Sequence, residues 1–167
     1  MGIFARIFQR PAPVSVEWVG QEQRFHTSTW SVTLPADWAL RRVEKAALYF
    51  ESADRHKGLY VTQYQIDTRQ APLRDITRRL HEASRAGLSA LHDFEWSLQR
   101  DEVIAYDRES TALLDAHDAQ RCYRLCTQTQ VKPPYALRVA YHDAICQNYI
   151  LGRTRAAQLL ASVQITA

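Results

Sequence analysis

Residues 46–66 read AALYFESADRHKGLYVTQYQI, and residues 72–92 read PLRDITRRLHEASRAGLSALH. The first stretch has two arms rich in β-branched and aromatic residues, joined by a polar loop that ends at Gly58. It therefore predicts a β-hairpin. In the second stretch apolar residues recur at i, i+3, i+4 and i+7 opposite an arginine-rich face, and Pro72 suits a first turn. This pattern predicts one long amphipathic helix.

Shorter runs on both sides of these stretches predict further strands. They cover residues 14–18, 30–34, 94–98, 103–106, 111–116, 120–129, 135–141 and 144–151. Gly152 then breaks the pattern, and Thr154 can cap a short helix that continues to Val163. Strands joined by short turns pair antiparallel. We therefore predict an α+β fold, in which an antiparallel β-sheet is covered by one long central helix and a C-terminal helix, within a single domain of residues 14–167.

Residues 1–13 are predicted to form a separate short amphipathic segment. Ile3, Phe4, Ile7 and Phe8 recur at helical spacing, and a pair of prolines ends the pattern by residue 13. Two interpretations remain open. Residues 1–10 could anchor the protein to a membrane surface, or they could form a terminal turn packed on the domain.

Composition argues against several classes of protein. The 167 residues carry a net charge of only +3, and the arginines are scattered along the chain, so we predict no nucleic-acid partner. No run approaches the roughly 20 apolar residues of a membrane helix. Three cysteines cannot form a closed disulfide framework, which predicts a cytoplasmic protein with reduced thiols.

Cys122, Cys126, His142 and Cys146 have a spacing that resembles a zinc site. If residues 120–129 are a strand, however, Cys122 and Cys126 share a face but lie about 13 Å apart, too far for one zinc ion. We therefore predict no metal and no cofactor, with the cysteines acting as small buried hydrophobic residues.

A thiol nucleophile is the alternative interpretation of the same segment. Cys146 lies near His142 in sequence, and Asp143 could orient the imidazole, as in a small hydrolase or thiol enzyme. The chain has no phosphate-binding glycine loop, no zinc-protease motif and no serine-hydrolase motif. We therefore predict that the protein is not an enzyme.

Tyrosines on the second arm of the hairpin suggest a contact surface. Tyr60, Thr62 and Tyr64 alternate with other residues and so share one face of their strand. Tyrosine and tryptophan are favoured at protein interfaces. We therefore take Tyr60, Thr62, Tyr64 and Trp38 as candidate partner-binding residues.

The layout also resembles a known fold. The carrying stretches are WSVTLPADW at 30–38, LYVTQYQI at 59–66, the helix at 72–92, the strand meander and the closing LLASVQI at 159–165. Over residues 25–165 this arrangement resembles the Mog1/PsbP-like fold, an α/β/α sandwich. Several small bacterial proteins of that group are chaperones or adaptors for type VI secretion effectors, and related domains are immunity proteins. The resemblance implies a non-catalytic domain that binds another protein, such as an effector or toxin; a homodimer stays open.

Overall fold

A computed structural model describes residues 5–7, 13–44, 47–69 and 71–166 of the chain. Its larger sheet has eight strands and is antiparallel throughout. In spatial order its path runs β5 (Ala39–Glu44), β6 (Ala47–Glu51), β7 (Lys57–Ile66), β11 (Tyr135–Asp143), β10 (Tyr123–Lys132), β9 (Ser110–Asp118) and β8 (Ser97–Ala105). The short strand β1 (Ala5–Ile7) pairs with the far end of β7.

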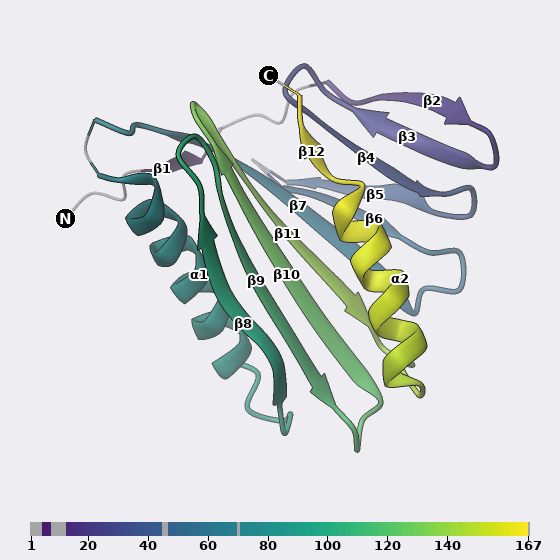
Figure 1. Cartoon of the computed structure of the whole chain (residues 1–167). Coiled ribbons are helices and arrows are strands. Elements are labelled where there is room, and N and C mark those ends of the chain that lie inside the picture. Colours follow the sequence, from purple (N-terminus) through teal and green to yellow (C-terminus); the bar gives the residue numbers. More distant parts are fainter. Residues whose placement is uncertain (1–4, 8–12, 45–46, 70, 167) are drawn as a thin grey trace.

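A smaller sheet and two helices complete the molecule. The smaller sheet has the order β12 (Gln164–Ile165), β4 (Trp30–Pro35), β3 (Glu22–His26) and β2 (Ser15–Val19). Helix α1 (Leu73–Ser89) lies on one face of the large sheet, and helix α2 (Tyr149–Ala161) lies beside the smaller sheet on the opposite face (Figure 1). The predicted α+β class is confirmed, with one long helix and one C-terminal helix covering antiparallel strands.

The hydrophobic core divides between the two faces of the large sheet. The main core lies between the large sheet, the smaller sheet and α2, and includes Phe50, Leu59 and Val139, all fully buried. On the other face, α1 packs its apolar stripe, including Ile76 and Leu88, onto the sheet through two smaller clusters. The alternating strand pattern thus sends every second residue of β6, β7 and β11 into the main core.

Several strand predictions need correction. Residues 144–151 do not form a strand, because Asn148 caps a helix by accepting a hydrogen bond from the Leu151 N–H, so that α2 begins at Tyr149. Strand β8 is continuous, without the break predicted after residue 98. Strands β3 and β5 were not predicted, since their sequences are polar and charged. Strand β2 lies at the sheet edge, so it is fully exposed rather than half-buried.

The N-terminal prediction is also wrong where the structure describes it. Residues 5–7 form a strand paired with Tyr64–Ile66 of β7, not part of an amphipathic helix. The remaining residues of the 1–13 segment, except Pro13, lie outside the described part of the chain. None of the described helices is both long enough and apolar enough to span a membrane.

Candidate functional site

A row of aromatic rings crosses the α1-side face of the large sheet. Tyr49 on β6 stacks on Tyr60 of β7 with ring centroids 4.4 Å apart, and both stack near His142 of β11 at 6.1 Å. His142 in turn stacks on Tyr123 of β10, also at 6.1 Å. Trp96, which precedes β8, contacts Tyr123 edge-on at 5.9 Å. These five residues, called the aromatic row below, come from five separate segments of the chain.

Strand pairing explains why the rings meet. Tyr49 lies directly opposite Tyr60 in the β6–β7 ladder, and His142 lies opposite Gly58 in the β7–β11 ladder. Gly58 leaves space for both rings: a Cβ atom there would overlap Nε2 of His142 and would lie 2.6 Å from the Tyr49 ring. The glycine predicted only as a loop end therefore leaves room for the Tyr49 and His142 side chains to meet above β7.

The aromatic row carries little charge of its own. Burial lowers the pKa of His142, so its imidazole is neutral at pH 7. Burial and the neighbouring Glu51 carboxylate raise the pKa of Tyr49 to about 12, and burial also raises the pKa of Tyr123. The Tyr49 hydroxyl donates a hydrogen bond to Glu51 at 3.3 Å. The row thus combines apolar ring faces with phenol and imidazole groups, the composition favoured at interface hot spots.

Part of this face lies beyond α1. The helix packs on β8, β9 and β10, and its first half also covers Tyr64, Ile66 and the start of β11. Tyr60 is 42% exposed, which is high for an aromatic ring in the middle of a sheet. Among the described residues, no helix covers this corner of the sheet, formed by β5, β6, the first half of β7 and the end of β11. We call it the open face.

The four predicted contact residues lie in different places. Tyr60 and Thr62 lie on the open face, as the alternation predicted. Tyr64 points to the same side but is half-buried against α1. Trp38 is only 5% exposed, lies in the main core and stacks on Tyr141 at 6.5 Å. Trp38 therefore does not belong to the same surface as Tyr60.

Sequence reasoning missed most of the aromatic row. The sequence pattern identifies Tyr49 only as an aromatic residue of a strand and predicts a turn between residues 141 and 144, whereas Tyr49 and His142 both lie within strands that pair with β7. The strand register shows that the side chains of Tyr49 and His142 point to the same face of the sheet as that of Tyr60. The alternation of side chains along each strand could have placed them on one face, but only if the register between the strands were known. That register depends on pairing between distant parts of the chain.

Trp38 instead lines a cavity of about 470 Å³ on the other side of the sheet. The cavity lies between the β4–β5 turn, the β6–β7 loop and α2, with Tyr141 beside Trp38. Asp54 lies at its edge, and hydrogen bonds from the Ser52 hydroxyl and the His56 N–H lower its pKa to about 2. Three carboxylates, of Glu22, Asp37 and Asp54, and two cations, Lys57 and Arg155, line the cavity, so it carries mixed charge.

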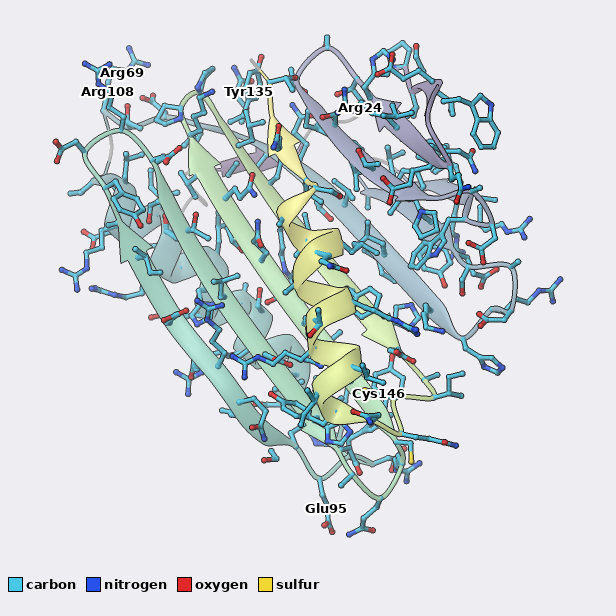
Figure 2. The ribbon with its side chains drawn as sticks, turned by 45° about the vertical axis from the view of Figure 1, so that its right-hand side comes forward. Arg24, Arg69, Glu95, Arg108, Tyr135 and Cys146 are labelled. Carbon is cyan, nitrogen blue, oxygen red and sulfur yellow. The ribbon has the colours of Figure 1, made fainter. Side chains whose placement is uncertain are left out.

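The three thiols do not form one site. Cys122 lies in the turn before β10 with a φ of 51°, so only Cys126 lies on the strand, and the predicted shared strand face is wrong. Cys126 lies beside the buried Asp115 and Arg124 side chains. Cys146 packs against Gly152 in the first turn of α2, and Figure 2 shows Cys146 near that end of the helix. Within the described residues no group of three or more His, Cys, Asp or Glu side chains is placed to hold a metal.

Cys146 and His142 do not make a nucleophile–base pair. The Cys146 side chain is 4% exposed and lies under α2, whereas the His142 ring lies in the aromatic row on the opposite face of the sheet. Burial also raises the pKa of the Cys146 thiol, which disfavours the thiolate that a nucleophile needs. The alternative of a thiol enzyme built on this pair is therefore wrong.

The three cysteines should react at different rates, because they are buried to different extents. At neutral pH we expect iodoacetamide to modify Cys122 first, because Cys126 and Cys146 are buried and burial raises the pKa of Cys126 to about 12. Peptide mass mapping during a time course measures the order, and all three should react together in guanidinium. Early labelling of Cys146 in the native protein would contradict the buried arrangement.

Comparison with known proteins supports the fold at low sequence identity. No protein-family model and no curated protein matches the sequence. The solution structure of cyanobacterial PsbP (CyanoP) from Synechocystis sp. PCC 6803 is similar, with a TM-score of 0.65 and 13% identity over 89% of this chain and 94% of that one. The Ran-binding protein Mog1p of Saccharomyces cerevisiae is similar with a TM-score of 0.52 and 6% identity, over 92% of this chain and 96% of that one. The chain therefore has a Mog1/PsbP-like fold.

Proposed function

We propose that this chain is a non-catalytic protein-binding domain and that the part of the aromatic row on the open face, Tyr49, Tyr60 and His142, is its contact surface. The single observation that carries the proposal is Tyr60, a 42% exposed ring that stacks on both Tyr49 and His142. Exposed aromatic rings on a rigid sheet bury a large area at low entropic cost when a partner covers them. One protein of the same fold, Mog1p, is itself a Ran-binding protein.

We also propose a partner class. The resemblance of residues 30–38 and 59–66 to small bacterial proteins supports a chaperone, adaptor or immunity protein that holds a secreted effector or toxin. Three free cysteines are compatible with action in the cytoplasm. This finer proposal concerns the identity of the partner and not the surface that binds it.

Site-specific photo-crosslinking tests both proposals. The photoreactive residue p-benzoylphenylalanine replaces Tyr60 in the full chain, expressed in its native cell, and the adducts are identified by mass spectrometry. We expect one dominant adduct, and we expect it to be a secreted effector or toxin. The same substitution at Tyr106, which is 63% exposed and outside the aromatic row, provides the matched control.

The outcomes separate the two levels of the proposal. Equal labelling at positions 60 and 106, or no adduct at position 60, argues against the aromatic row as a contact surface. A single adduct that is neither an effector nor a toxin supports the surface but removes the proposed partner class. A Tyr60→Ala variant should lose the adduct formed from a reporter placed at Thr62 on the same strand.

A further inference from the structure

We infer that the open face accepts an amphipathic helix of the partner, and that a carboxylate on this helix pairs with Arg138. The inference rests on the proposed function, because it uses the same surface and adds the shape and charge of the partner. It depends on three features of the described residues: the extent of the open face, the wall that α1 forms beside it, and an arginine without a counter-ion.

The open face has the size of one helix. Four strands at about 4.8 Å spacing span roughly 14 Å between the first and the fourth. One α-helix with side chains is about 10–12 Å across, so one helix fits beside α1 and two do not. The aromatic side chains project from the face of the sheet and not from its hydrogen-bonding edge, so they offer apolar side-chain surface to a helix stripe rather than backbone groups to an added strand.

Helix α1 presents small residues to this space. Gly87 lies beside Arg138 of the sheet: a Cβ atom on Gly87 would lie 3.8 Å from Nη2 of Arg138. Ala83 lies one turn earlier on the same side of the helix, and both residues are exposed. Small exposed side chains let a second helix approach closely, which helix packing at 8–10 Å between axes requires.

Arg138 supplies the charge. Its side chain lies on the α1-side face of β11, opposite Thr62, and its Nε atom is buried without a hydrogen-bond partner. Among the described residues it makes no ion pair, whereas Glu51, the carboxylate next to Tyr49, is already 3.5 Å from Arg41. A buried donor without a partner is costly, and a guanidinium is best satisfied by a carboxylate. The charge that complements this surface is therefore negative.

Selection from a peptide library tests the inference. The full-length protein selects from an mRNA-display library of 16-residue peptides with helix-forming backbones and a randomised face, and the affinities of the winners are then measured. We expect helical peptides with an apolar stripe and Glu or Asp at one fixed position. Their affinity should fall about 30-fold or more with R138Q, which removes the charge but keeps a polar, shorter side chain.

Matched variants distinguish the possible failures. R108Q alters an exposed arginine at the β8–β9 turn and should leave affinity unchanged, and R138Q should leave the melting temperature unchanged. Neutral or basic winners, extended winners, no winners, or equal affinity for R138Q would overturn this inference. If peptides of another kind are selected and their affinity falls with Tyr60→Ala, the proposed contact surface stands. If their affinity is unchanged by Tyr60→Ala, that proposal fails as well.

Discussion

Replacing Arg124 by leucine should lower the free energy of unfolding by about 3–5 kcal/mol, because it leaves a buried carboxylate without its partner. Arg124 is only 1% exposed, and its guanidinium donates to both carboxylate oxygens of Asp115 across the β9–β10 ladder. Its Nη1 also donates to the Tyr149 carbonyl at 3.1 Å, and the guanidinium lies over the Tyr149 ring. One side chain thus joins the sheet to the first turn of α2.

Urea unfolding of three variants measures this effect. The single variant Arg124→Leu should show the full loss, and the double variant Arg124→Leu/Asp115→Leu should recover most of it, because no unpaired charge then remains buried. Arg24→Ala provides the control, since the Arg24–Glu17 pair is about half exposed on both sides and should contribute no more than about 1 kcal/mol. A double variant as unstable as the single one would show that α2 docking, rather than the unpaired charge, dominates.

The parts of the fold that sequence could predict are those with strong local patterns. The hairpin that contains Gly58 and the long helix were placed correctly, because alternation and helical periodicity are local signals. The start of α2 was missed because YIL at 149–151 reads as strand, whereas the Asn148 cap begins a helix there although Ile150 and Leu151 are exposed. Strand β2 shows a strand pattern although its apolar residues are exposed at the sheet edge.

The candidate site was predicted only in part for a different reason. Tyr60 and Thr62 could be assigned to one face from their spacing alone. His142 joins them through the β7–β11 pairing, which connects residues more than 60 positions apart, and Tyr123 joins through the β10–β11 hairpin, whose register the spacing alone does not give. Arg124 looked like one of many scattered arginines, and only the tertiary structure distinguishes this buried arginine from the exposed ones.

Replacing Phe50 by alanine should lower the free energy of unfolding by about 3–5 kcal/mol, while Tyr49→Phe should cost no more than about 1.5 kcal/mol. Phe50 is fully buried in the main core, where its ring meets that of Phe25 at 4.8 Å, so truncation leaves a cavity. Tyr49 faces the other way and loses only the hydroxyl that donates to Glu51.

Urea unfolding measures the loss of unfolding free energy in each variant, provided that the m-value is unchanged. Affinity for the partner is then measured in buffer without urea, where both variants are folded, so that an effect on binding is not confused with unfolding. Phe50 lies on the main-core face of β6, whereas Tyr49 lies on the open face. We therefore expect the folded Phe50→Ala variant to keep its affinity for the partner. Tyr49→Ala, by contrast, should weaken binding while the protein remains folded, because it removes the ring that stacks on Tyr60. Equal loss of affinity in both variants would mean that binding depends on the core as a whole, and the two faces of β6 would then have no separate roles.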